Sequence, residues 1–199
     1  MARRRTVLAI VGLPGSGKSL ASVMLRKMGF DIIELGDIWR ELLAKNGIPR
    51  SDPKATREFT RRIREKYGKE VYAKHAFRKI KSLRGDVAVL GIRSTYEMDY
   101  FRRRMKDIGV IALLAPIDVR FGRLRTRAKP EDPKVMKDLK WLDTREKRGF
   151  MKDKSEEKHG VMRVMEGADF VIANTSTVKK LEQNLKKAIK EIEMRNTKS

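Results

Sequence analysis

The sequence contains no cysteine, a single glutamine and few aromatic residues, which make up 7% of the 199 residues. The absence of cysteine excludes disulfides and thiolate metal sites, and we expect an intracellular, cytoplasmic protein. No apolar run approaches the roughly 18 residues of a membrane-spanning helix, so no membrane partner is expected. The apolar run Val7–Val11 follows the basic Arg3–Arg5 but stops at Gly12, which favours a first strand over a targeting segment.

Acidic residues are also fewer than basic residues. The chain has 48 Lys and Arg against 26 Asp and Glu, a net charge of +22. A surface this basic attracts phosphate-rich partners, either nucleotides or nucleic acid, and the alternative is a merely solubilising surface. Abundant Lys, Arg and Glu with a single Gln is typical of a protein from a thermophile. The charge disfavours self-association at low salt, but it leaves the oligomeric state open.

Short apolar runs alternate with helical patterns along the chain. The runs are Thr6–Val11, Asp31–Leu35, Val87–Leu90, Val110–Leu114 and Phe170–Ala173. The final helix carries an apolar stripe at spacings of three and four, made of Val178, Leu181, Leu185, Ile189 and Ile192. This alternation predicts an α/β protein, with a five-stranded parallel sheet covered by helices on both faces. We expect one domain over residues 1–199.

Two stretches interrupt this alternation. Residues 46–69 carry Pro49, Pro53 and Gly68 among mixed charges, and residues 123–159 begin with a proline-containing loop before a strongly charged helical run. Insertions on such a sheet commonly cover a substrate. We therefore expect residues 46–69 to be an acceptor-side insertion and residues 123–159 to be a lid.

The strongest motif follows the first predicted strand. It reads Gly12-Leu13-Pro14-Gly15-Ser16-Gly17-Lys18-Ser19 and fits the G-x-x-x-x-G-K-[ST] pattern completely. The glycines allow successive amides to point at phosphate oxygens, and the following helix adds the positive end of its dipole. Lys18 is expected to reach the β and γ phosphates of ATP, and the Ser19 hydroxyl to bind Mg²⁺. The motif predicts the P-loop nucleoside-triphosphate hydrolase fold, with ATP and Mg²⁺ as cofactors.

Three further side chains follow predicted strands. Asp37 and Arg40 come after the second strand and Arg93 after the third, and ligands of doubly wound sheets bind at the carboxyl ends of the strands. Arginine can hold phosphate oxygens in a two-pronged geometry, so Arg40 and Arg93 are candidates for holding the phosphate acceptor. Asp37 would accept a proton from an acceptor hydroxyl, order Mg²⁺ and water, or cap the helix ahead of Ile38.

A run of arginines leads into the second insertion. Arg120, Arg123 and Arg127 share one helical face because they are spaced by three and four. Like charges this close repel one another unless an anion lies among them. We expect Arg123 and Arg127 to stabilise the transferring phosphoryl group, and the alternative is a solvated face.

These segments resemble known kinases. Glu34-Leu35-Gly36-Asp37-Ile38-Trp39-Arg40 resembles the Gly-Asp-hydrophobic-hydrophobic-Arg segment of adenylate kinases, and Gly91-Ile92-Arg93-Ser94 is similar to their Asp-Gly-Phe-Pro-Arg segment. In that family both arginines bind the acceptor phosphate, which implies this role for Arg40 and Arg93. The chain departs from the pattern at Leu90, where adenylate kinases have an Asp, and it lacks a clear copy of their lid signature.

The resemblance continues to the last strand. Residues 168–175, Ala-Asp-Phe-Val-Ile-Ala-Asn-Thr, resemble the segment of dephospho-coenzyme A kinases that borders the adenine of ATP, which implies ATP contact for Asn174. As a whole the chain looks closest to an archaeal family of adenylate-kinase-related ATP-binding proteins. The resemblance implies a nucleoside monophosphate kinase-like fold with an acceptor-side insertion and a lid.

The leading hypothesis is a small-molecule kinase that transfers the γ-phosphate of Mg-ATP to a nucleotide or a nucleotide-like acceptor. The accepting group is either a phosphate or a hydroxyl. One alternative is a nucleotide-dependent nucleic-acid-binding protein, which the basic charge favours although no nucleic-acid-binding motif is present. Another is an ATP-binding protein without phosphotransfer, for which Leu90 is the indication.

Overall fold

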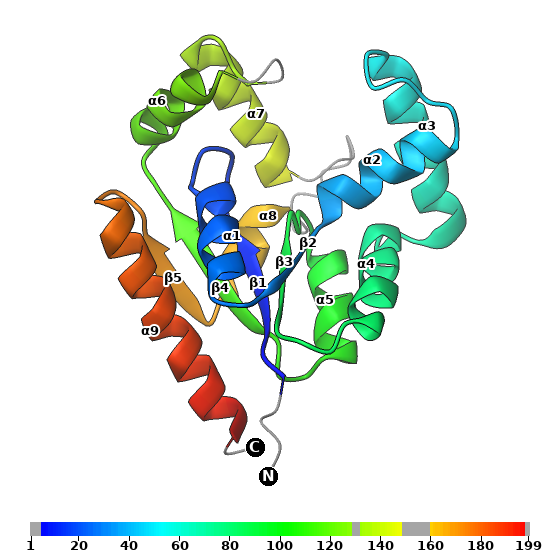
Figure 1. Ribbon diagram of the computed structural model, residues 1–199. Coiled ribbons are helices and arrows are strands. Elements are labelled where there is room, and N and C mark those ends of the chain that lie inside the picture. The colour runs from blue at the N-terminus through cyan, green and yellow to red at the C-terminus, as the bar shows by residue number, and fades with distance from the viewer. Residues whose placement is uncertain (1–4, 129–131, 149–159, 198–199) are drawn as a thin grey trace.

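The computed structural model describes residues 5–128, 132–148 and 160–197. Its core is a parallel sheet of five strands in the order β2-β3-β1-β4-β5 (Figure 1). The strands are β1 Val7–Val11, β2 Asp31–Glu34, β3 Val87–Leu90, β4 Gly109–Leu114 and β5 Phe170–Ala173. Each of the five lies within one or two residues of its predicted range. The predicted fold class is therefore confirmed.

The sheet is buried on both faces because its strands are apolar throughout. In β1, Val7, Ala9 and Val11 pack into one hydrophobic cluster, whereas Leu8 and Ile10 pack into the other. This division follows the two-residue period of a strand. An uninterrupted apolar run, rather than alternation with polar residues, thus marks a strand with helices on either side.

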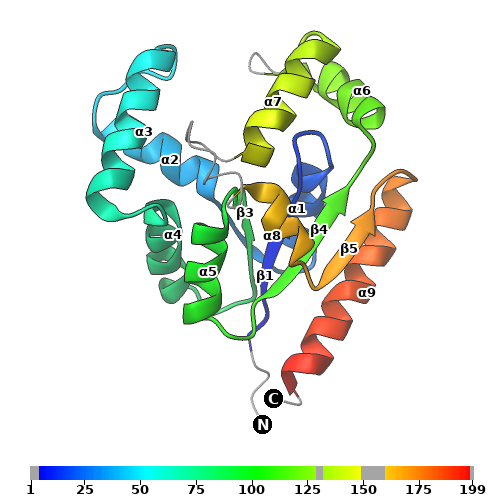
Figure 2. The ribbon, with the colours of Figure 1, turned by 180° about the vertical axis from the view of Figure 1, so that it is seen from behind.

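The helices form the two outer layers (Figures 1 and 2). One face of the sheet is covered by α1 Lys18–Lys27 and α9 Val178–Thr197. The other face packs against α2 Leu35–Lys45, α4 Val71–Ser82, α5 Thr95–Arg104 and α8 Val161–Glu166. None of the described helices is long and apolar enough to cross a membrane.

The apolar stripe of α9 is shorter than predicted. Leu181, Leu185, Ile189 and Ile192 are buried, as their spacing predicts, but Val178 is 58% exposed. Val178 is the first residue of the helix, which begins beyond the carboxyl end of β5. The side chain therefore lies outside the layer that covers the sheet.

Two helical lobes stand at the carboxyl end of the sheet. One is formed by α2 and α3 Pro53–Tyr67, and the other by α6 Ile117–Arg127 and α7 Met136–Arg148 (Figure 1). Helix α3 accounts for most of residues 46–69, and Asp52 caps it by accepting hydrogen bonds from the amides of Lys54 and Ala55. Helix α7 lies within residues 123–159, whose last part, 149–159, is outside the described residues.

Candidate functional site

The loop between β1 and α1 curves around a cradle that requires glycine. Gly15 and Gly17 have φ of +77° and +107°, in the left-handed region that side chains rarely adopt. A Cβ atom on Gly17 would lie 2.2 Å from Asn174 Nδ2, and one on Gly15 would lie 2.7 Å from the Arg120 carbonyl oxygen. The glycines of the motif therefore serve close packing under the loop as well as its curvature.

The amino-terminal end of α1 is suited to an anion. Gly17 is the N-cap residue and makes no side-chain capping bond, and the first turn contains no acidic residue. The Ser16 hydroxyl is buried, and among the described residues it has no hydrogen-bond partner. A phosphate oxygen in the cradle would satisfy both the exposed amides and this hydroxyl. The loop thus fits the phosphates of ATP, with the Ser19 hydroxyl at the start of α1 as the side chain that would bind Mg²⁺.

Lys18 folds back over the loop. Its ammonium group donates hydrogen bonds to the carbonyl oxygens of Gly12 at 2.6 Å and Leu13 at 3.0 Å. The Lys18 pKa is lowered to about 8, mainly by burial and next by the positive charge of Arg93, against the opposing effects of Glu146 and Glu34. A phosphate that replaced the two carbonyl oxygens would restore a full counter-charge to the ammonium group.

Arg93 and Glu146 bring the two sides of the site together. Arg93 follows β3, and its Nη1 lies 3.1 Å from Oε1 of Glu146, which is on α7. The Glu146 side chain is buried at 7% exposure, whereas that of Arg93 is 48% exposed. The charge of Arg93 lowers the pKa of Lys18, and the charge of Glu146 raises it. The structure therefore places predicted acceptor-binding Arg93 near the phosphate loop and adds an acid that the sequence interpretation missed.

Asn174 joins the end of β5 to the loop. Its Nδ2 donates a 2.8 Å hydrogen bond to the Ser16 carbonyl oxygen, and its own carbonyl oxygen accepts one of 2.8 Å from Arg123. Arg123 also donates to the Gly15 carbonyl oxygen at 3.4 Å. Both side chains lie beneath the loop, where they fix its shape. In this structure Arg123 is bound to backbone oxygens of the site.

Arg120, which shares a helical face with Arg123 and Arg127, is buried in an ion pair. Its side chain is 4% exposed and forms a two-pronged ion pair with Asp143 of α7, whose side chain is 8% exposed. It also donates to the carbonyl oxygens of Ala115 and Pro14, each at 3.1 Å. Because these acceptors use its guanidinium, Arg120 connects α6, α7 and the loop rather than facing a ligand.

Arg127 lies near the site with a different partner. It is hydrogen-bonded to both carboxylate oxygens of Asp132, which is buried at the start of the following segment. Its positive charge contributes to the low pKa of Lys18, although less than burial and Arg93 do. The shared helical face of the arginine run is therefore divided between a buried ion pair at Arg120, Arg123 bonded to the loop, and Arg127 paired with Asp132.

Asp37 and Arg40 form a pair on the exposed face of α2. The helix begins at Leu35 with Glu34 as its N-cap residue, so Asp37 lies inside the first turn and is not the cap. Asp37 accepts a hydrogen bond from Arg40, and both side chains are exposed, by 59% and 37%. The alternative interpretation of Asp37 as a helix cap was wrong because the helix begins at Leu35 and not at Ile38.

Two acidic residues of this region were missed. Glu34 ends β2 in register with Leu90 of β3, so a carboxylate stands beside the position where Leu90 replaces an acid. Its place at the end of a predicted strand was a signal that could have found it. Glu146 lies in a charged helical run, where spacing alone does not show which side chain turns inward.

Buried Glu97 orders the loop that carries Arg93. Its Oε2 accepts hydrogen bonds from the amides of Arg93 at 2.8 Å and Ser94 at 3.2 Å, as part of a capping box. Arg64 of α3 lies 3.8 Å from its other carboxylate oxygen. Burial raises the Glu97 pKa, and the Arg64 charge opposes that shift. The Ser-x-x-Glu spacing was the available sequence signal for this element.

Metal ligands are sparse in this region. In residues 5–128, 132–148 and 160–197, no group of three or more His, Asp or Glu side chains could hold a metal ion. At the loop, Ser19, phosphate oxygens and water would form the oxygen ligand set that Mg²⁺ prefers at such sites.

The sheet order, the loop and the two lobes define a P-loop, nucleotide-binding protein of the kinase-like class. Residues 8–148 match the AAA domain family. Among relatives, the UPF0200 protein of Pyrococcus horikoshii is 32% identical over 191 residues, which cover 94% of this chain and 97% of the relative. The chain therefore belongs to the AAA domain family and to the UPF0200 family of archaeal proteins.

Other similar proteins agree with this placement. The UPF0200/UPF0201 protein of Archaeoglobus fulgidus is 35% identical over 196 residues, and the chain spans 57% of that relative's length. Among solved structures, a gluconokinase from Sinorhizobium meliloti has 14% identity and a TM-score of 0.56, with 98% of each chain covered. A shikimate kinase from Bacteroides thetaiotaomicron has 14% identity and a TM-score of 0.52, over 93% of this chain and 98% of its own. At these identities the two structures share the fold.

Proposed function

We propose that the protein is a small-molecule kinase that transfers the γ-phosphate of Mg-ATP to an anionic, nucleotide-like acceptor. The observation that carries the proposal is the surroundings of Lys18. Its pKa responds to Arg93 after β3, Arg127 on α6 and Glu146 on α7, so charges from separate segments converge on the phosphate loop. Phosphoryl transfer requires such convergence, because its catalysis consists mainly of positioning and charge neutralisation.

The nucleotide side of the site is formed by the loop and by α1. The loop amides and Lys18 would bind the β and γ phosphates, the Ser19 hydroxyl would bind Mg²⁺, and Asn174 would border the nucleotide from β5. Mg-ATP supplies the phosphoryl group when bound. Arg123 and Arg127 would neutralise the charge that develops during transfer.

The acceptor side lies between α2 and the β3–α5 loop. Arg40 and Arg93 are the candidates for holding an acceptor anion, and Asp37 stands one helical turn before Arg40. If the acceptor is a hydroxyl, Asp37 would take its proton, whereas an acceptor phosphate needs no base. The lobe of α6 and α7 would act as the lid that excludes water from the reaction.

The presence of Leu90 is compatible with retained catalysis. Adenylate kinases have an acid at this position, and here Glu34 places a carboxylate at the matching register of the neighbouring strand. The negative charge of Glu34 acts on Lys18, so it lies within electrostatic range of the phosphate loop. Glu34 would thus order Mg²⁺-bound water in place of the missing acid, and its removal would lower turnover more than ATP affinity.

The proposal is tested by transfer of labelled phosphate from Mg-ATP to AMP, CMP, UMP, GMP, dephospho-coenzyme A and small sugars. A labelled product is expected from at least one acceptor with the natural protein and from none with Lys18→Ala. Lys179→Ala, an exposed lysine at the start of α9, serves as the matched control. ATP binding without transfer to any acceptor would contradict the kinase proposal and leave the class that binds ATP without phosphotransfer.

A further inference from the structure

A second pocket lies between α2, α3 and α4, with a volume of about 980 Å³. Its floor is apolar and partly aromatic, formed by Leu42, Ile48, Phe59, Ile63 and Val71. Tyr67, which is 51% exposed, lies at its edge. This volume and lining are typical of sites that hold one small organic molecule.

Positive charge surrounds this apolar floor. Arg62, Lys66, Lys74 and Arg78 line the pocket, and none of its described lining residues is acidic. Lys74 is partly neutralised by Glu70 at 2.8 Å, whereas the Lys66 ammonium group lies over the ring of Tyr67, 5.2 Å from its centroid. Since four cations and no acidic side chain are among the described lining residues, the rim of the pocket attracts an anion more than an uncharged ligand.

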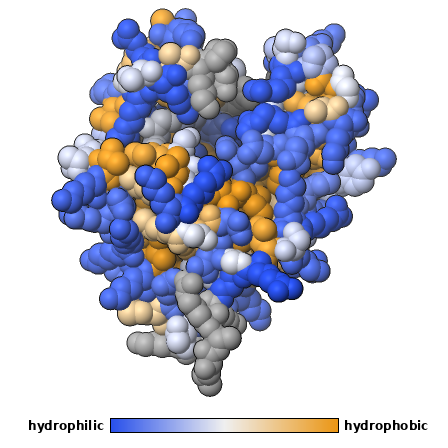
Figure 3. All heavy atoms as spheres, viewed as in Figure 1, coloured by the Kyte–Doolittle hydropathy of each residue, from blue (hydrophilic) through white to orange (hydrophobic). Residues whose placement is uncertain are grey.

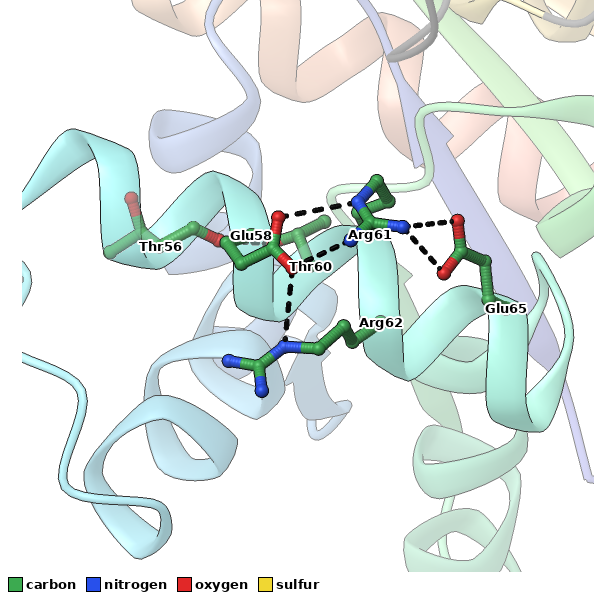
Figure 4. Close-up of polar contacts among 6 residues, drawn as sticks. All are labelled: Thr56, Glu58, Thr60, Arg61, Arg62 and Glu65. Carbon is green, nitrogen blue, oxygen red and sulfur yellow. Dashed lines mark hydrogen bonds and ion pairs between the residues drawn. The ribbon is translucent and has the colours of Figure 1, made fainter.

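The ion pairs of α3 leave Arg62 directed away from its nearest acid (Figure 4). Arg61 engages the carboxylates of Glu58 at 2.6 Å and Glu65 at 2.8 Å. Arg62 contacts the same Glu58 only through Nε, at 3.6 Å, and its two terminal nitrogens point away from that carboxylate. Arg61 thus forms the shorter ion pairs with Glu58 and Glu65. The terminal nitrogens of Arg62 point away from Glu58.

The pocket lies on a different face of α3 from the acceptor side. Phe59 and Ile63 line the pocket, whereas the next residues around the helix, Thr60 and Arg64, interact with other partners. Thr60 accepts a 3.0 Å hydrogen bond from Trp39 Nε1. Arg64 reaches the Glu97 carboxylate beneath the Arg93 loop. A ligand in the pocket would therefore not occupy the site of phosphoryl transfer.

His75 lines the pocket, and the charged groups around it shift its pKa. Burial lowers its pKa, and the charges of Arg78, Lys45 and Lys79 lower it further, against a smaller opposing effect of Glu41. These groups come from α2 and α4, and Arg62 and Lys66 of α3 line the same pocket. Cations therefore outnumber acids among the charges that act on His75, and an anion bound beside it would favour the imidazolium.

We infer that this pocket is a second binding site for a free organic phosphate, with the ring of the ligand between Phe59 on the floor and Tyr67 at the edge, and its phosphates between Lys66 and Arg78. The inference goes beyond the proposed function, since it concerns a site apart from the phosphate loop. A single mononucleotide matches both the volume and the combination of an apolar floor with a cationic rim. The ring and the phosphates of the ligand would both contribute to its affinity for the pocket.

The test follows His75 by nuclear magnetic resonance in a Lys18→Ala background, which weakens nucleotide binding at the loop. The chain contains two histidines, His75 and His159, so the variant His75→Gln assigns the signals. ADP is expected to raise the pKa of His75 saturably, by at least about 0.5. Adenosine alone and inorganic pyrophosphate alone should produce smaller shifts and require higher concentrations.

Variants of the pocket cations distinguish specific binding in the pocket from nonspecific attraction of ADP to a basic surface. Lys66→Glu and Arg78→Glu should abolish the ADP-induced rise, whereas Lys81→Glu, an exposed change of the same charge on α4 outside the pocket, should leave it. Arg78→Gln provides a milder variant should either reversal alter the melting curve. An equal response in all variants, or no rise with ADP, would overturn the inference. A rise with a short single-stranded RNA but not with ADP would also overturn it.

Discussion

Arg93 and Glu146 form an ion pair, 3.1 Å between Nη1 and Oε1, that closes the α6–α7 lobe against the β3–α5 loop. The pair uses the arginine that the proposed function assigns to the acceptor anion. On that proposal, the Glu146 carboxylate contacts the same cation that the acceptor anion would contact. Binding of the acceptor would then require Glu146 to move away from Arg93, so the lobe and the acceptor compete for one cation.

Glu146→Gln should strengthen acceptor binding. The substitution keeps the size of the side chain but removes the charge that competes for Arg93, so the KM for an anionic acceptor should fall by about fivefold. The KM for ATP should change less, since Arg93 is on the acceptor side. Steady-state phosphotransfer kinetics with the acceptor that gives product measure both constants.

The matched control for this substitution is Glu166→Gln. Glu166 pairs with Arg163 on the exposed surface of α8, at 2.6 Å. This control should leave both constants unchanged. A rise in acceptor KM on Glu146→Gln would show that Glu146 contributes to acceptor binding and does not compete with it.

Much of the fold was predictable because its signals are local. Each strand is a short apolar run, and each run lies between segments with helical spacing, so the order of elements determines a parallel sheet with crossovers. The phosphate loop was equally predictable, because its glycines are required by the close contacts of Gly15 and Gly17. The limits of elements were less certain, as Leu35 shows, because it lies where a strand gives way to a helix.

The polar contacts of the site were harder to predict. Arg120 and Arg127 share a helical face and the same chemistry, yet one is buried on Asp143 and the other is held by Asp132. Which arginine becomes buried depends on the packing of α7 against α6, a relationship that residue spacing does not contain. On the face that Figure 3 shows, most residues are hydrophilic, so hydropathy alone does not separate such side chains. Packing between distant segments therefore gives Arg120 and Arg127 different partners, although the sequence alone does not distinguish them.

ATP affinity should decrease with pH above about 8. The Lys18 pKa is about 8 in the free protein, and bound phosphates would raise it by supplying negative charge. Below pH 8 the lysine is already protonated in both states, so affinity changes little. Above pH 8 the free protein has lost the proton that the complex retains, so binding takes up one proton and the affinity falls by up to about tenfold per pH unit.

Calorimetry in two buffers of different ionisation enthalpy measures this proton uptake directly. At pH 9 the uptake should approach one proton per ATP with the natural protein. In Lys18→Arg the guanidinium keeps its charge, so any remaining binding should show little uptake. Uptake near zero for the natural protein at pH 9 would contradict the assignment of Lys18 as the residue whose pKa is perturbed.

Asp143→Ala should destabilise the protein strongly. The substitution leaves the Arg120 guanidinium buried without its carboxylate, and breaking a buried pair in this way costs about 3–5 kcal/mol. The double variant Arg120→Met with Asp143→Leu should recover most of that loss, because it removes both charges. Urea denaturation followed by circular dichroism gives the free energies of unfolding. Equal losses in the single and double variants would show that packing volume, not the charge, controls stability here.

Asn174→Ala should weaken ATP binding through the shape of the loop. The Asn174 amide donates to the Ser16 carbonyl oxygen at 2.8 Å and lies against Gly17, so its removal leaves a buried acceptor unpaired and loosens the cradle. An unpaired buried group costs about 1–3 kcal/mol, and we expect ATP affinity to fall by about tenfold. Isothermal calorimetry measures that affinity, with Gln183→Ala on the exposed surface of α9 as the matched control.

Because the Arg123 bond is made to the Asn174 backbone, Arg123 should remain in place, and the kcat with saturating ATP should fall less than the affinity does. Unchanged affinity with reduced stability would limit Asn174 to a structural role.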